Sequence, residues 1–327
     1  MPDDASDASP EHQPAKASAP PAGLVLVSTP IGNLADLPPR ARDALAAADL
    51  VLCEDTSHTA RLLTALGIHA RTEPLHEYNE DARIPAVLSR LAAGQTVALV
   101  SDAGTPLVSD PGYRLVRAAI AAGAPLTAIP GPNAAVTALV LSGLPPLPFL
   151  VLGFPPPRQA ARVAGFQRLR AAEQAGLRAT LIWYEAPHRL AETLADLANV
   201  FGARPAAVAR ELTKRFEEIR RAPLPTLAAN YAATPPRGEI TILIGPPDPD
   251  EPTTNATNLD TQLLAALTTH TTRDAAALIA TATGLPRKHV YARALALAAS
   301  DGGREVGDAG EQKEGQGALP PGPPPRA

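Results

Sequence analysis

Short apolar runs, each followed by a helical pattern, constrain the fold of this chain most. Four of them occur in its first half, at residues 24–28, 50–53, 96–100 and 126–130. Strands that alternate with helices predict a parallel sheet joined by crossover helices. The turn residues agree with this division, since Pro38 suits a first helical turn and Gly67 and Gly143 suit helix ends.

A second α/β unit is expected after the proline-rich stretch 144–149. Apolar runs at 149–154, 179–185, 206–212 and 239–246 predict its strands, and 188–202 has a helical pattern. The expected organisation is an N-terminal α/β domain at 23–146, a second α/β domain at 147–247, a linker at 248–258, a helical domain at 259–300, and disordered tails at 1–22 and 301–327.

Charge and composition set limits on partners and location. The net charge is −4, but residues 1–22 carry −3 and residues 301–327 carry −2, so the body is close to neutral and an anionic partner is not excluded. A single cysteine excludes an internal disulfide and a Cys-cluster zinc site. The N-terminus lacks the apolar core of a signal peptide, and prolines interrupt the longest apolar stretch, 134–154. These features predict a cytoplasmic protein without a membrane segment.

The loops that end the first four strands are distinctive. They comprise residues 28–33, 54–59, 101–106 and 130–135, and three of the four are rich in Gly and Pro. Turn chemistry alone accounts for any one of them. Because the carboxyl ends of parallel strands meet at one sheet edge, four such loops together predict a binding cleft there.

The motifs and residue types that the loops lack exclude several classes of ligand for this cleft. The sequence has no GxxxxGK[ST] loop, no GxGxxG after the first strand and no HExxH or Cys/His cluster. The loops also contain almost no Lys or Arg, which argues against a ligand rich in phosphate. Carboxylates and backbone groups suit a ligand that carries positive charge.

Several long motifs occur in a characteristic order. They are TPIGNLAD (29–36), EDTSHTARLL (54–63), HEYNE (76–80), SDAGTPLVSDPG (101–112), PGPNAAVTAL (130–139), YEAPHRL (184–190), ARELTK (209–214) and GE (238–239). Over residues 23–300 the chain resembles the ribosomal RNA small subunit methyltransferase I family, which has the tetrapyrrole-methylase fold. The resemblance implies methyl transfer from S-adenosylmethionine to the ribose 2′-hydroxyl of a cytidine in the decoding centre of 16S rRNA.

The resemblance also implies where the cofactor is held. It places the cofactor in a cleft between the two α/β domains, in contact with Ile31, Gly32, Asp102, Gly104, Thr105, Ala134, Ala135, Tyr184 and Gly238. Asp110 is expected to cap the helix that starts near Pro111 rather than to bind a ligand.

The catalytic residue is left open among several candidates. A ribose hydroxyl is a poor nucleophile unless its proton is accepted as the new bond forms. The candidates are Asp55, Asp102, Glu211 and Lys214, with Glu54 and His188 also considered. Asp55 and Asp102 are preferred, although Asp55 has the alternative role of capping the helix at Ser57, and His188 of capping or packing at its own helix.

Two regions are candidates for RNA contact. The chain has Ser57 where the family pattern has an arginine, and Arg61 lies one helical turn away. In the helical domain, Arg287, Lys288 and Arg293 fall on or beside the second helix of a helix-turn-helix pattern. The same pattern also fits a helical hairpin that stabilises a dimer.

Two other functions compete with rRNA methylation. One is a methyltransferase of the same fold that acts on a tetrapyrrole, another small molecule or a protein side chain. The other is a non-enzymatic RNA-binding factor for ribosome assembly. The resemblance further implies a homodimer paired through apolar helices.

Overall fold

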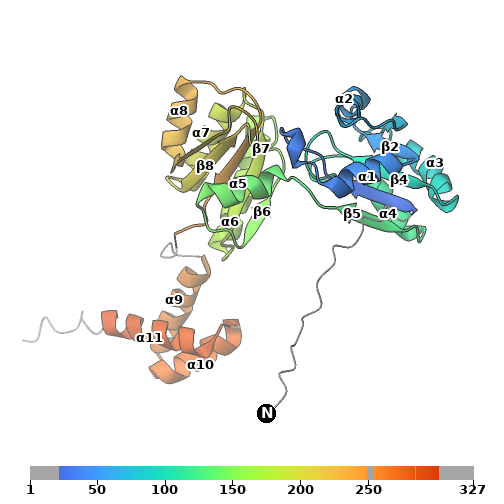
Figure 1. Cartoon of the computed structure of the whole chain (residues 1–327). Helices are drawn as coiled ribbons and strands as arrows, with labels where there is room; N and C mark the ends of the chain where they lie inside the picture. Colours follow the sequence, from blue (N-terminus) through green and yellow to red (C-terminus); the bar gives the residue numbers. More distant parts are fainter. Residues whose placement is uncertain (1–21, 249–253, 284, 302–327) are drawn as a thin grey trace, which may run out of the picture. The chain divides into compact units, whose positions relative to one another are not determined.

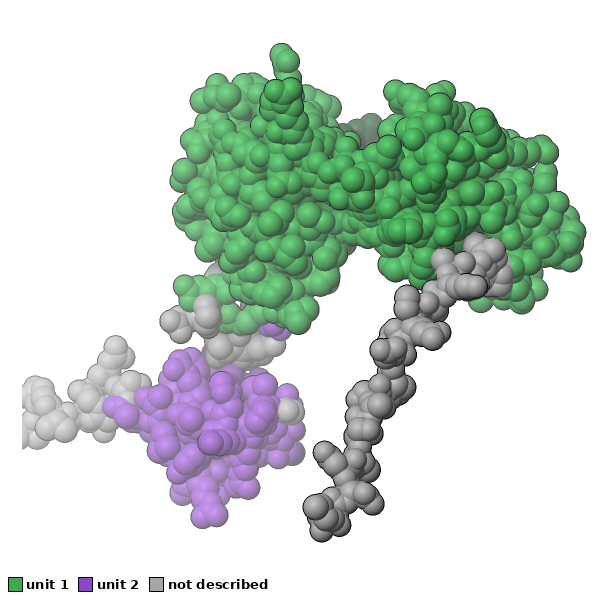
Figure 2. All heavy atoms as spheres, in the orientation of Figure 1, with its two compact units in different colours: residues 1–172, 177–249 green, residues 173–176, 250–327 purple. Residues whose placement is uncertain are grey.

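The computed structural model describes residues 22–248, 254–283 and 285–301 (Figure 1). The expected tails, apart from Ala22 and Asp301, lie outside the described residues, as do residues 249–253 of the expected linker and Gly284. The chain divides into two compact units, Met1–Ala172 with Leu177–Pro249, and Glu173–Gly176 with Asp250–Ala327 (Figure 2). The first unit contains two lobes, each built on its own sheet.

The first lobe has a wholly parallel sheet in the order β3-β2-β4-β1-β5. Its elements are β1 (Gly23–Val27), the short helix η1 (Leu34–Asp36), α1 (Pro39–Ala47), β2 (Leu50–Cys53), α2 (Thr56–Leu66), β3 (Thr72–Pro74), α3 (Glu80–Ala92), β4 (Thr96–Val100), α4 (Tyr113–Ala121) and β5 (Leu126–Ile129). The parallel sheet confirms the expectation from strand–helix alternation. The sequence patterns did not predict β3, which has only three residues and no apolar run, or α3, which contains Pro85 in its interior.

Helices cover both faces of this sheet. Val25, Val51 and Ala98 face α1 and α2, whereas the adjacent residues Leu24 and Leu50 face α3 and α4. Successive residues of a strand point to opposite faces, so an uninterrupted apolar run serves both layers. The loops after the strands are therefore held by a sheet that is buried on both sides.

The second lobe has a mixed sheet in the order β6-β7-β10-β8-β9. Its elements are β6 (Phe149–Val151), α6 (Gln159–Gln174), β7 (Thr180–Glu185), α7 (Leu190–Phe201), β8 (Pro205–Arg210), β9 (Glu218–Pro223), α8 (Leu224–Ala233) and β10 (Ile240–Ile244). Only the β6–β7 pair is parallel. The four strands read from the sequence are present, and β9, α6 and α8 are additional.

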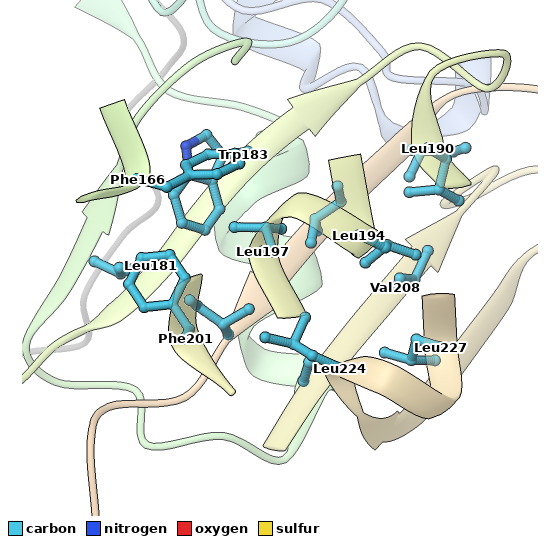
Figure 3. Close-up of a cluster of buried hydrophobic side chains, with 14 of the residues drawn as sticks. Phe166, Leu181, Trp183, Leu190, Leu194, Leu197, Phe201, Val208, Leu224 and Leu227 are labelled. Atoms are coloured by element: carbon cyan, nitrogen blue, oxygen red, sulfur yellow. The ribbon is translucent and has the colours of Figure 1, made fainter. Parts of the chain in front are cut away.

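One face of the second sheet packs on α6, α7 and α8. Figure 3 shows this core, in which Trp183 lies beside Phe166 with ring centroids 5.5 Å apart. The alternate strand residues Ile182 and Leu243 point to the other face, where they pack against Ala138 and Leu139 of α5 (Ala134–Ser142).

Helix α5 thus packs on the second sheet, although the sequence placed it in the first domain, which was expected to end at 146. It is apolar around its circumference, with Ala135, Ala138 and Leu139 buried. Ile31 from the first lobe joins the same cluster. The helix that begins at one of the edge loops is therefore fixed by the core of the second lobe.

The second unit contains α9 (Thr254–Leu267), α10 (Thr272–Thr283) and α11 (Arg287–Asp301). Leu263, Ala275 and Val290 are fully buried and form a small core among the three helices. Helix α9 begins inside the range 248–258 that the sequence assigned to the linker.

Candidate functional site

The loops at the carboxyl ends of the first-lobe strands are tied together by hydrogen bonds. Thr29 and Gly104 exchange both backbone hydrogen bonds, at 2.9 and 3.1 Å. The Thr105 hydroxyl donates to the Pro132 carbonyl at 3.3 Å and accepts from Asn133 Nδ2 at 3.3 Å. Three of the four predicted loops therefore form one connected wall.

This wall borders a cavity of about 350 Å³, within the range of small-molecule sites. The first lobe contributes Ile31, Asp102–Asp110 except Pro106 and Leu107, Asn133 and Ala134, and the second lobe contributes Phe154, Tyr184–Pro187, Ala209, Leu212 and Gly238–Thr241. The expected cleft between the two lobes is thus present as a defined cavity.

Seven of the nine residues proposed as cofactor contacts line this cavity. They are Ile31, Asp102, Gly104, Thr105, Ala134, Tyr184 and Gly238. The other two, Gly32 and Ala135, are not among the lining residues. A β-carbon at Gly32 would collide with the Lys214 side chain, and Ala135 is fully buried.

Tyr184 and Phe154 form an aromatic wall on the second lobe, with ring centroids 5.6 Å apart. The backbone N–H of Ala135, in the first turn of α5, is hydrogen-bonded to Tyr184. Burial raises the pKa of the Tyr184 phenol, so the side chain is a neutral hydroxyl at physiological pH.

Four carboxylates line the cavity, and two of them have cationic partners. Glu185 pairs with Arg189 at 3.3 Å, and Glu239 pairs with Lys214 at 3.1 Å. Asp102 and Asp110 form no ion pair within the described residues. None of the described side chains that line the cavity is lysine or arginine, so the site has net negative character.

Asp55, a preferred catalytic candidate, is the N-cap of α2. Its carboxylate accepts from the backbone N–H groups of Ser57 and His58 at 2.7 and 3.2 Å, and these bonds hold its pKa below the usual value. It does not line the cavity. Asp102, the other preferred candidate, lines the cavity and accepts from the Asp55 backbone N–H at 3.2 Å.

Glu211 and Lys214, also proposed as catalytic, pair with each other at 2.9 Å outside the cavity lining. Burial opposes the charge of each, but their mutual contact and those to Glu239 leave the pKa of Glu211 lowered and that of Lys214 raised. A β-carbon at Gly238, where φ is +88°, would collide with the Glu211 carboxyl. This cluster supports the second-lobe wall of the cavity.

The expectation that Asp110 caps α4 is wrong. The N-cap is Gly112, and the side chain that accepts from the first turn of α4 is that of Glu80, which takes the Leu115 N–H at 2.8 Å. Gly112 has a φ of 119°, and only Pro111 and Gly112 separate Asp110 from α4, with the Asp110 side chain lining the cavity.

The side chains proposed to contact RNA differ in their exposure and in their partners within the protein. Arg61 is exposed on α2 and lies 3.4 Å from His58 Nδ1. Arg287 and Lys288 are exposed at the start of α11. Arg293 instead makes a bidentate pair with Asp260 of α9, at 2.7 and 2.6 Å. Its guanidinium therefore holds helices of the second unit together.

Sequence reasoning missed several cavity residues, including Val108, Ser109, Asp110, Phe154, Glu185 and Glu239. All of them except Phe154 lie inside a quoted motif, so for these only the contact with the cavity was unexpected. Over the described residues, no group of three or more His, Cys, Asp or Glu side chains is placed to hold a metal ion, and no helix is long and apolar enough to cross a membrane.

Comparison with known proteins defines the class to which this fold and cleft belong. Residues 23–228 match the family described as Tetrapyrrole (Corrin/Porphyrin) Methylases, and residues 253–298 match the RsmI C-terminal HTH domain. The fold is also that of the methyltransferase CobJ, whose crystal structure aligns with a TM-score of 0.51 and 21% identity over 69% of this chain and 94% of that chain.

Relatives with higher sequence identity define the family within this class. The chain is 46% identical to the ribosomal RNA small subunit methyltransferase I of Mesorhizobium japonicum, over 85% of this chain and 93% of that protein. It is 45% identical to the protein of the same name from Xylella fastidiosa, over 83% of this chain and 98% of that protein. The chain belongs to the ribosomal RNA small subunit methyltransferase I family.

Proposed function

We propose that this protein transfers a methyl group from S-adenosylmethionine to the ribose 2′-hydroxyl of a cytidine in the decoding centre of 16S rRNA. The observation that carries the proposal is a cavity with unpaired carboxylates at the carboxyl edge of the first sheet, in a chain of this methyltransferase family.

The residues of the cavity fit the proposed methyl donor. Asp102 and Asp110 supply negative charge for a ligand with a sulfonium and an ammonium group, and no lining cation among the described residues opposes it. Phe154 and Tyr184 offer apolar and aromatic surface, and the Gly104 backbone allows close approach. S-adenosylmethionine, when bound, supplies the methyl group in electrophilic form.

An RNA substrate agrees with the surface around the loops. Tyr113 and Phe216 are 63% and 64% exposed, and each lies under an arginine, Arg117 at 5.8 Å and Arg215 at 5.6 Å. Exposed aromatic rings paired with arginines suit stacking on unpaired bases. In the second unit, the exposed Arg287 and Lys288 suit contact with phosphates.

The proposal includes the protein's setting. The substrate is the small ribosomal subunit or its RNA, so the enzyme acts in the cytoplasm. We also propose a homodimer, formed through apolar helix surface such as Val140 of α5, which is 70% exposed.

The test is methyl transfer by the purified protein. Small subunits are incubated with the protein and S-adenosylmethionine labelled in its methyl group, and the RNA is digested to nucleosides. Label in 2′-O-methylcytidine is expected. Label in the ribosomal protein fraction, or in a tetrapyrrole supplied in a parallel reaction, supports the first rival. RNA binding without any transfer supports an assembly factor.

A pair of variants links the transfer to the cavity. Asp102→Ala removes a lining carboxylate, whereas Asp43→Ala removes an exposed carboxylate on α1 outside the cavity. Loss of transfer in the first variant alone is expected. Equal activity of both variants contradicts the placement of the donor.

A further inference from the structure

Asp110 is a half-buried carboxyl group in the cavity wall that neither the sequence nor the family resemblance assigned to the site. It does not cap α4, and it forms no ion pair within the described residues. A partly buried carboxylate without a cation costs free energy, so its retention at the cavity calls for a role there.

The backbone just before Asp110 is strained. Leu107 and Ser109 have φ angles of 73° and 70°, in the left-handed region that side chains disfavour. Ser109 also lies against the second lobe, because a β-carbon at Gly153 would be 3.2 Å from its hydroxyl oxygen. Such strain is maintained by surrounding contacts and is common at functional sites.

The charges that face Asp110 are all negative or neutral. Burial is the main reason that the pKa of Asp110 rises to about 6, and the carboxylates of Glu54 and Asp102 raise it further. The Ser101 hydroxyl lowers the pKa by a smaller amount. From the second lobe, the neutral phenol of Tyr184 faces it, and the charge of Asp110 in turn contributes to the raised pKa of Tyr184.

We propose that Asp110 is the catalytic residue that accepts the proton of the ribose hydroxyl, an inference that rests on the function proposed above. The hydroxyl oxygen forms a bond to the methyl carbon with a lone pair. The carbon–sulfur bond of the donor breaks and its electron pair stays on sulfur, which becomes neutral. The hydroxyl proton passes to an oxygen of the Asp110 carboxylate and is later released to water.

Asp110 suits this role better than Glu185, Glu239 or Asp55, and Asp102 is assigned above to the methyl donor. A general base must be ionised at neutral pH and still be able to bind a proton. A pKa slightly below the working pH meets both requirements. The oxygens of Glu185 and Glu239 already face Arg189 and Lys214. Asp55 is occupied as a helix cap away from the cavity.

The first test uses Asp110→Asn, which keeps the shape of the side chain. The kcat/KM of the wild type should fall tenfold per pH unit below about pH 6, because the protonated carboxyl cannot accept a proton. Asp110→Asn should lower kcat by about 10²–10⁴-fold and remove this inflection. Affinity for S-adenosylmethionine at pH 8, measured by calorimetry, should change much less than kcat. An unchanged kcat with the same inflection overturns the proposal.

A second variant tests the proposal even if Asp110→Asn folds poorly. Glu54→Gln removes a negative charge that raises the pKa of Asp110 but does not line the cavity. The inflection in kcat/KM should therefore move to lower pH. An inflection that stays at the wild-type position overturns the assignment to Asp110.

A measurement independent of activity separates this inference from the proposed function. The ¹³C carboxyl resonances of aspartate-labelled protein, recorded without ligand, should include one that titrates near pH 6 and is lost in Asp110→Asn. Absence of that titration overturns the inference. Failure of the wild type to methylate RNA overturns the proposed function, whatever the titration shows.

Discussion

Gly238 connects the cavity wall to the Glu211–Lys214 cluster, and its replacement by alanine tests that connection. Gly238 lines the cavity with a φ of +88°, and an added β-carbon would collide with the Glu211 carboxyl. Glu211 Oε1 accepts from the Glu239 backbone N–H at 3.0 Å and from Lys214 Nζ at 2.9 Å. Room for the β-carbon can be made only if this carboxyl leaves its partners.

The magnitude follows from two contributions. A left-handed backbone costs an alanine about 1–2 kcal/mol relative to glycine. A hydrogen bond to a charged group is worth about 1.5–3 kcal/mol, and at least one such bond of Glu211 is lost. Gly238→Ala should therefore lower the free energy of unfolding by about 2.5–5 kcal/mol.

Gly94→Ala is the matched control. Gly94 has a similar φ of +76° but nothing within 4 Å of its β-carbon position, so it should show the backbone cost alone. Urea denaturation of both variants gives the difference, and calorimetry with S-adenosylmethionine should show at least about tenfold weaker binding for Gly238→Ala only, which corresponds to about 1.4 kcal/mol. If Gly238→Ala is no more destabilising than Gly94→Ala and binds the donor normally, the reasoning about this cluster is refuted.

Four further predictions concern binding, stability and assembly. Calorimetry should show weaker binding of S-adenosylmethionine by Asp102→Ala, and an affinity equal to that of the wild type refutes its contact. Replacing Arg287 and Lys288 together by alanine should lower the slope of log RNA affinity against log salt concentration by about two units, while the affinity for S-adenosylmethionine stays unchanged. Arg293→Ala should chiefly destabilise the second unit, since Arg293 is paired with Asp260. Sedimentation at micromolar concentration should show a dimer, and a monomer alone contradicts the proposed pairing.

The features that the sequence predicted are those encoded locally. Apolar runs with Gly or Pro at their ends define strands and helix ends within a few residues, as at Gly67 and Gly143. Since parallel strands share an edge, the loops 28–33, 101–106 and 130–135 could be assigned to one cleft without knowledge of any contact, whereas the fourth predicted loop, 54–59, does not line the cavity. The family motifs then indicated residues of that cleft, most of which line the cavity.

The features that the sequence did not predict depend on packing over long distances. Helix α5 is apolar on all sides, so its pattern does not say which sheet it joins. The pairing of Arg293 with Asp260 joins residues 33 positions apart, and nothing in the basic pattern 287–293 distinguishes it from a phosphate contact. Asp110 precedes Pro and Gly at a helix start, which is typical of a cap, and only the fold shows that it faces the cavity.

The most direct test of the central claim is a map of ribose methylation in 16S rRNA from cells that lack this gene. One cytidine of the decoding centre should lose its 2′-O-methyl group and regain it when the wild-type gene, but not one encoding Asp102→Ala, is restored. A decoding centre whose ribose methylation is unchanged in the deleted cells contradicts the claim.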